Sequence, residues 1–139
     1  MRSWFSKLIK RPPCAEDPDF GKLTYMGGYW EGAGIFPPTR DEVEYFVSAG
    51  EDGPSEANRQ AFQTICGNYA GLLAKAVSAI SSATESTANA NELAISSLDV
   101  PSGDLGACTW EMNFSGTDGS FFSVQFSGLE ATGAVDVSY

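Results

Sequence analysis

Histidine is absent from this chain of 139 residues. Its absence excludes Ser-His-Asp and Cys-His catalysis in their usual forms. It also excludes HExxH zinc sites and most catalytic zinc sites, which use imidazole ligands. Long apolar runs are missing too. No stretch approaches the roughly 20 apolar residues of a membrane-spanning helix, so we expect no stable membrane insertion.

Cysteine is scarce. The three cysteines, Cys14, Cys66 and Cys108, are an odd number and form no CxxC pair. They therefore indicate neither a disulfide framework nor a structural Cys₄ zinc site. Because no secretion signal precedes them, we expect reduced thiols and a cytoplasmic location. Cys66 lies within an apolar helical pattern, and we expect it to pack in the core.

Several ligand-binding motifs are also missing. The glycines of residues 27–34 form neither a P-loop nor a GxGxxG that opens a helix. The turn around Asp118 lacks the carboxylate spacing of a calcium loop, and no GxSxG motif is present. We therefore expect no enzyme activity, no catalytic residue, no bound metal and no cofactor.

Charge is distributed very unevenly along the chain. There are 8 basic and 18 acidic residues. Four of the basic residues precede Pro12 and all the acidic residues follow it, so residues 12–139 carry a net charge of −14. Such an acidic body repels nucleic acid and attracts a basic protein partner. The alternative is that the acidity only maintains solubility.

Residues 1–13 form an amphipathic basic segment that we separate from a single domain at 14–139. Its apolar residues fit one face of a short helix, and Pro12-Pro13 ends that helix. The basic residues lie beside this face. The segment could dock on its own domain, form a homo-oligomer through residues 1–11, or lie weakly on an anionic membrane. The residues concerned are Arg2, Trp4, Phe5, Lys7, Leu8, Ile9, Lys10 and Arg11.

The domain has the pattern of an α+β fold. Residues 20–34 predict a β-hairpin that turns at Gly27-Gly28, and residues 42–49 predict a third strand. Apolar residues three and four apart predict one long helix at about 54–82 that covers one face of the sheet. Further strands are predicted at 92–100, 107–115, 120–127 and 134–139. We expect a single antiparallel sheet of about six or seven strands.

The start of the domain resembles a known kind of small protein. Residues Asp19-Phe20-Gly21-Lys22-Leu23, followed by Trp30-Glu31-Gly32, resemble the opening of small uncharacterised bacterial domains, in which an F-G-x-L strand pairs with a W-x-G strand. Those domains are similar to proteins encoded beside secreted bacterial toxins. There, small acidic immunity proteins occlude a toxin's active site. The resemblance implies an acidic module that binds a cognate toxin, and it carries over no catalytic residue.

Aromatic residues and acids alternate in and after the first hairpin. Aromatic anchors with an acidic rim are a common design for binding a basic protein. Two alternatives stay open: the aromatics belong to the core and the acids to a solvated edge, or the carboxylates form a cleft that binds a small ligand or catalyses a reaction. The candidate partner-binding residues are Tyr29, Trp30, Glu31, Asp41, Glu42 and Glu44.

Overall fold

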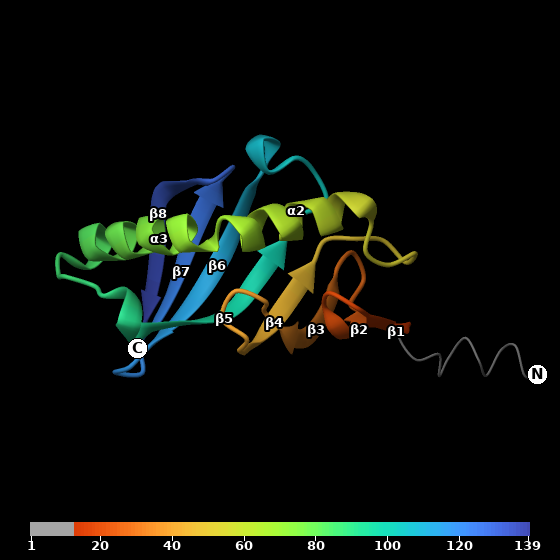
Figure 1. Cartoon of the computed structure of the whole chain (residues 1–139), viewed down its shortest axis with the longest axis horizontal. Helices are drawn as coiled ribbons and strands as arrows, with labels where there is room; N and C mark the ends of the chain where they lie inside the picture. The colour runs from red at the N-terminus through yellow and green to blue at the C-terminus, as the bar shows by residue number, and fades with distance from the viewer. Residues whose placement is uncertain (1–12) are drawn as a thin grey trace, which may run out of the picture.

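The computed structural model describes residues 13–139 (Figure 1). They form one eight-stranded sheet in which the strands lie side by side in chain order. Two helices lie over one face of this sheet, and no element of residues 13–139 covers the other, which we call the open face (Figure 1). The basic segment predicted at 1–13 falls, up to residue 12, outside the described residues.

The strands are β1 (Cys14–Asp17), β2 (Gly21–Tyr25), β3 (Trp30–Ile35), β4 (Glu42–Val47), β5 (Leu93–Val100), β6 (Thr109–Gly116), β7 (Phe121–Ser127) and β8 (Glu130–Ser138). Between β4 and β5 the chain forms α2 (Glu56–Gly67) and α3 (Tyr69–Thr84). Two 3₁₀ helices, η1 (Ala90–Glu92) and η2 (Leu105–Ala107), precede β5 and β6. The predicted α+β class and single sheet are confirmed.

The sheet differs from the prediction in two details. It has eight strands, because the unpredicted β1 pairs with the free edge of β2. β1 has only four residues and lies between Pro13 and Pro18, so its sequence carries no strand signal. In addition, β4 and β5 are parallel, whereas every other neighbouring pair is antiparallel. The helices make this crossover by returning the chain to the end of the sheet where β4 began.

The predicted long helix is two helices. Asn68 separates them with φ −116° and ψ 13°, outside the helical region. Its side chain donates to the carbonyl oxygen of Thr64 at 2.7 Å, and Gly67 beside it is a poor helix former. The apolar stripe continues across the break, with Ile65 before it and Leu72 after it, both buried. A stripe of this kind therefore could not reveal a one-residue interruption.

The core lies between the helices and one face of the sheet. The side chains of Val43, Tyr45 and Val47 on β4 are fully buried on this side. Around Tyr45, Phe20 and Phe62 pack edge-to-face with it, at centroid distances of 5.4 and 5.5 Å. Edge-to-face packing is favourable for aromatic rings beyond their burial alone. The core therefore fixes α2 over β4.

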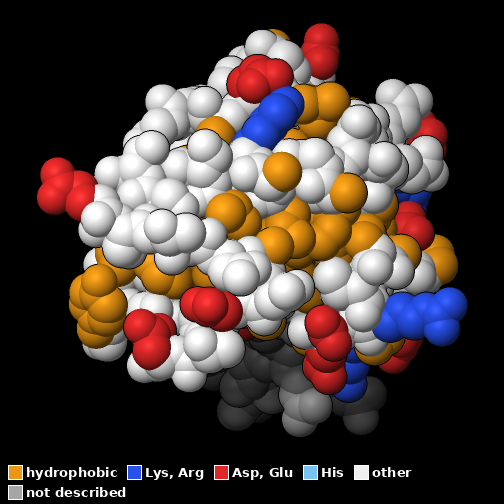
Figure 2. All heavy atoms as spheres, turned by 60° about the vertical axis from the view of Figure 1, so that its left-hand side comes forward, with side chains coloured by type: hydrophobic (Ala, Val, Ile, Leu, Met, Phe, Trp, Pro, Cys, Tyr) orange, Lys and Arg blue, Asp and Glu red, His pale blue; other side chains and the backbone are white. Residues whose placement is uncertain are grey.

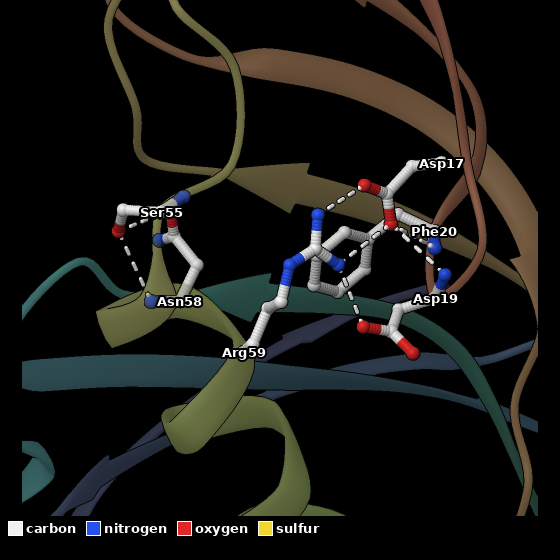
Figure 3. Close-up of polar contacts among 6 residues, drawn as sticks. All are labelled: Asp17, Asp19, Phe20, Ser55, Asn58 and Arg59. Carbon is white, nitrogen blue, oxygen red and sulfur yellow. Dashed lines mark hydrogen bonds and ion pairs between the residues drawn. The ribbon is translucent and has the colours of Figure 1, made fainter.

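Polar contacts anchor the start of α2 (Figure 3). Ser55 and Asn58 form a capping box, which satisfies amide groups that the first helical turn leaves unpaired. Asn58 is fully buried. Its amide nitrogen donates to the carbonyl oxygens of Ser48 at 3.0 Å and Pro101 at 2.9 Å. One side chain thus joins the ends of β4 and β5 to the helix.

An ion-pair cluster joins α2 to the β1–β2 turn. Arg59 pairs with Asp17 and Asp19, each at 2.7 Å, and Figure 3 shows its guanidinium between the two carboxylates. Asp17 also accepts the backbone amides of Asp19 and Phe20 at 2.9 and 3.1 Å. This cluster holds the edge of the sheet against the helix layer.

The outer strand β8 is irregular. Its register against β7 shifts between Val124 and Phe126, and Gly133 has φ +92°, which favours glycine. Thr132 donates to the side-chain oxygen of Gln125 at 2.9 Å and accepts the amide of Ala134 at 3.2 Å. A bulge therefore bends this edge of the sheet.

Candidate functional site

The open face of the sheet carries a set of carboxylates. On β4, Val43 and Tyr45 point to the helices, so Glu42 and Glu44 point the other way. Cross-strand pairing places their neighbours: Glu31 lies opposite Phe46, and Phe46 lies opposite a residue of β5, Asp99. We define the acidic face by its carboxylates on β3 to β6, which are Glu31, Glu42, Glu44, Asp99 and Glu111.

Basic residues hardly offset this charge. Lys22, on β2, is the single basic residue on any of the strands described between residues 14 and 138. Arg59 and Lys75 lie on the helices and are engaged in ion pairs there. The face therefore presents a net negative field to a binding partner.

The first part of the acidic face surrounds Glu31 and Glu44. These two residues are diagonal neighbours, since Glu31 pairs with Phe46 and Glu44 with Ala33. Partial desolvation, together with the neighbouring Glu31 carboxylate, raises the pKa of Glu44 above its ordinary value. A shallow hollow of about 530 Å³ lies here, lined by both glutamates, Glu42 and Lys22. A bound cation would relieve the repulsion between the glutamates.

The second part surrounds Asp99. A hollow of about 410 Å³ is lined by Asp99, Tyr29, Phe46 and Thr109. The rings of Tyr29 and Phe46 lie 6.3 Å apart between centroids. Burial and then the charge of Glu111 raise the pKa of Asp99 to about 6, although a backbone hydrogen bond from Glu111 opposes the shift. Aromatic rings beside a carboxylate suit a guanidinium or ammonium group.

The charge of Asp99 costs the fold stability, so Asp99→Asn is expected to raise the free energy of unfolding. A shift of about two pKa units corresponds to about 3 kcal/mol for a fully buried group. Asp99 is partly exposed, and screening reduces this to about 1 kcal/mol at pH 7.5. Because the folded pKa is raised, the wild-type protein regains stability as the pH falls through 6.

Urea denaturation of Asp99→Asn and wild type at pH 7.5 and pH 5 measures this difference. The advantage of the variant is expected to shrink at the lower pH, where folded wild-type Asp99 takes up a proton. A variant less stable than wild type at pH 7.5 would show instead that the carboxylate makes a stabilising contact.

The predicted site residues are only partly brought together. Glu31, Glu42 and Glu44 share the open face, and Tyr29 lines the hollow beside Asp99. Trp30 lies on the opposite face: it is 2% exposed, and its indole NH donates to the carbonyl oxygen of Gly50 at 2.7 Å. The prediction that Trp30 contacts a partner is therefore corrected: Trp30 belongs to the core, as do Phe36 and Tyr45.

Asp41 is also separate from the acidic face. It is exposed in the loop before β4, where its backbone oxygen accepts the amide of Phe36 at 2.8 Å. Its charge acts on Tyr69, whose pKa burial and then Asp41 raise to about 12. Since Tyr69 belongs to α3, Asp41 lies toward the helix side of the molecule.

The sequence prediction missed Phe46, Asp99 and Glu111. Alternation within 107–115 does put Glu111 on the polar side of its strand. Asp99 is harder to find, because a register shift between Ile95 and Ser97 breaks the simple alternation of β5. In addition, only the parallel pairing of β4 with β5 brings Asp99 beside Phe46. That pairing has no local sequence signal.

Cys66 packs against the core as predicted. Burial and then the charge of Asp19 raise the pKa of its thiol to about 11, so the reactive thiolate is scarce at neutral pH. Among residues 13–139, no group of three or more histidine, cysteine, aspartate or glutamate residues is arranged to hold a metal ion. No helix in this range is long and apolar enough to cross a membrane.

Another surface lies between α3 and β8. It has a shallow groove lined by Ser78, Ala79, Ser82 and Ala83 of α3 and by the start of β8. Figure 2 shows the molecule from the side at the left of Figure 1, where hydrophobic side chains gather in a band with acidic ones scattered around it. Its two charged lining residues, Lys75 and Glu130, pair with each other at 2.8 Å. The groove therefore offers little net charge for recognition, and we place the candidate site on the acidic face.

Searches of protein-family models, of curated proteins and of solved structures found no match to this chain.

Proposed function

We propose that the acidic face is the contact surface of a protein-binding module. Most concretely, the protein is a bacterial immunity protein that neutralises a cognate toxin in the cytoplasm by occluding its basic active site. The observation that carries this proposal is the hollow in which Asp99, a half-buried carboxylate, lies beside the rings of Tyr29 and Phe46. Burial raises the pKa of Asp99 to about 6, so its charge is expected to cost the fold stability at neutral pH. A group that is costly to the fold and faces a hollow is accounted for by a binding role.

The geometry supports recognition of two basic side chains. One would enter the hollow of Tyr29, Phe46 and Asp99. There it would make cation–π contacts with the two rings and an ion pair with the carboxylate. The other would lie between Glu31 and Glu44. Glu44 and Phe46 are two residues apart on β4, a spacing of about 7 Å along a strand. Two basic residues on one short element of a partner would match this spacing.

Charge reversal on the acidic face tests the proposal, with the product of the adjacent gene as the partner. We expect the double variant Glu31→Lys, Glu44→Lys to slow association by about 10- to 100-fold at low salt, because opposite charges steer the encounter. The difference in association rate between the variant and wild type should become smaller at about 1 M salt, where the Debye length is about 3 Å. Stopped-flow or surface plasmon resonance measures the rates.

The matched control is Asp41→Lys, Asp52→Lys, which changes the net charge equally in exposed loops. We expect its association rate to stay within about threefold of wild type, since it affects only the overall charge. Equal slowing by both variants would mean that net charge alone matters. A neighbouring gene product that neither binds nor is toxic would overturn the immunity assignment.

A second candidate is a carboxylate-dependent binder or enzyme for a small cationic ligand. It is favoured by the raised pKa of Glu44 beside Glu31 in one hollow near the first hairpin. Calorimetric titration with agmatine as the probe separates the two candidates. Saturable binding that Glu44→Gln abolishes would favour the small ligand, and heats of dilution alone would favour the protein partner.

A further inference from the structure

We propose that the basic segment of residues 1–11 docks on the acidic face of its own molecule and so competes with a basic partner for it. This inference deepens the proposed function, because it concerns regulation of the same surface. It rests on charge complementarity, on where the segment joins the sheet, and on the length of the segment.

Charge complementarity is the first argument. Residues 1–11 contain Arg2, Lys7, Lys10 and Arg11 and no acidic residue. The acidic face has five carboxylates, and Lys22 is the only base on the strands of the described part of the chain. At low salt, opposite charges of this number attract across more than 10 Å.

The place where the segment joins the sheet is the second argument. The chain enters β1 at Cys14, which pairs with Thr24 of β2. Thr24 pairs with Glu31, Glu31 with Phe46, and Phe46 with Asp99. These five residues form one continuous row across the open side of β1 to β5. The row therefore leads from the point of entry directly across the acidic face.

Length is the third argument. The row from β1 to β5 crosses four strand spacings, or about 19 Å. Eleven residues span about 16 Å as a helix and up to about 36 Å when extended. An extended segment is thus long enough to lie along the whole row and bring basic residues to both hollows, and a helical one covers most of the row. Its apolar residues Trp4 and Leu8 would find Phe46 in the row and, beside it, Tyr29, which is 39% exposed.

Tethering makes weak docking sufficient. A segment linked directly to the surface that it binds has an effective local concentration in the millimolar range. A dissociation constant of about 1 mM for the free segment would therefore cover the face in a large share of molecules. A toxin that offers more basic contacts would displace the segment, whereas a weakly basic protein would not. The segment would then act as a specificity filter.

Fluorine NMR of the full chain labelled with 5-fluorotryptophan tests this docking. The chain has three tryptophans, of which Trp30 and Trp110 are each 2% exposed and serve as buried references. Trp4→Phe assigns the remaining resonance. A soluble paramagnetic agent broadens exposed residues. We expect the Trp4 resonance to be shielded at about 10 mM salt and broadened strongly at about 1 M salt, where charge attraction is screened.

Charge variants locate the docking site. Both Lys7→Glu, Lys10→Glu and, separately, Glu31→Lys, Glu44→Lys are expected to expose Trp4 to the agent. Combining the four substitutions restores opposite charges, so Trp4 should become shielded again. Asp41→Lys, Asp52→Lys is the matched control and should leave Trp4 shielded. Trp30 and Trp110 should stay shielded in every variant, which confirms that each one is folded.

Three outcomes would overturn the inference. The first is that Trp4 proves exposed in the wild-type protein at low salt. The second is that Trp4 is shielded but its shielding is unchanged by Glu31→Lys, Glu44→Lys. The third is that the shielding is lost when the protein is diluted. The last outcome would indicate association between copies instead of docking within one molecule. If Trp4 is exposed while a basic partner still binds with charge dependence, the proposed function stands and only this inference fails.

Discussion

Replacing Asn58 by alanine is expected to lower the free energy of unfolding by about 3 kcal/mol, since it strands the carbonyl oxygens of Ser48 and Pro101. A buried acceptor that loses its donor costs about 1 to 3 kcal/mol. The bond to Pro101 is buried and the bond to Ser48 is partly buried, so most of the loss is expected from Pro101. The substitution also removes the acceptor of the capping box. In a chain of this size the loss corresponds to about 10 °C in Tm. Urea denaturation and thermal melts measure it.

Two further variants separate the contributions at this position. Ser55→Ala removes the cap but keeps both carbonyl contacts of Asn58, and we expect a loss of about 1 kcal/mol. Asn58→Asp keeps the acceptor for the amide of Ser55 but removes the donor, so it should be as destabilising as alanine or more. If Asn58→Ala costs no more than Ser55→Ala, the contacts to the strand ends contribute little.

Replacing Arg59 by methionine is expected to cost about 2 kcal/mol at pH 7, between the values for exposed and buried ion pairs. Methionine keeps much of the apolar stem but leaves the Asp17 carboxylate, which is 6% exposed, without its cation. In the native protein, burial tends to raise the pKa of Asp17. Hydrogen bonds from Arg59 and from two backbone amides outweigh this effect, and the pKa is lowered.

The effect of Arg59→Met depends on pH. A carboxyl group with a lowered folded pKa stabilises the protein above its ordinary value of 3.8 and loses that contribution as the pH falls through the folded pKa. In the variant, burial acts unopposed by the guanidinium, so acid unfolding should begin at a higher pH. The two proteins should converge in stability at the lowest pH values.

The matched control for Arg59→Met is Lys75→Met. Lys75 pairs with Glu130 at 2.8 Å, but the glutamate side chain is 78% exposed. We expect a cost below about 1 kcal/mol, because solvent screens such a pair. A double-mutant cycle with Asp17→Asn isolates the energy of the Arg59–Asp17 pair. A coupling no larger than that of Lys75 with Glu130 would contradict the role of this cluster.

Local patterns predicted the parts of the fold that depend on local burial. Strict alternation in 107–115 correctly put Trp110, Met112 and Phe114 on one face, and all three are buried. β1 could not be predicted in this way, because its pairing with β2 determines it. The same holds for the parallel pairing of β4 with β5, which depends on the path of the intervening helices.

In the candidate site, too, local patterns predicted some features, and others depend on strand pairing. Alternation already separates Trp30 from Glu31, since neighbours in a strand point to opposite faces, so an aromatic residue next to an acid in sequence is not its neighbour on a surface. Glu31 and Glu44 meet because β3 and β4 pair in the observed register. Asp99 joins them only across the chain crossover, and no local sequence pattern reports that contact.

The two edge strands of the sheet, β1 and β8, determine whether copies of this protein can associate by strand pairing at high concentration. At one end, β1 is four residues long and is flanked by prolines. At the other, the bulge at Gly133 bends β8 away from a straight edge. Short, proline-flanked and bulged edges are poor templates for the addition of another strand. An eight-stranded sheet with these edges is protected against the strand-by-strand growth that begins amyloid fibrils, so the protein can accumulate to high concentration without polymerising.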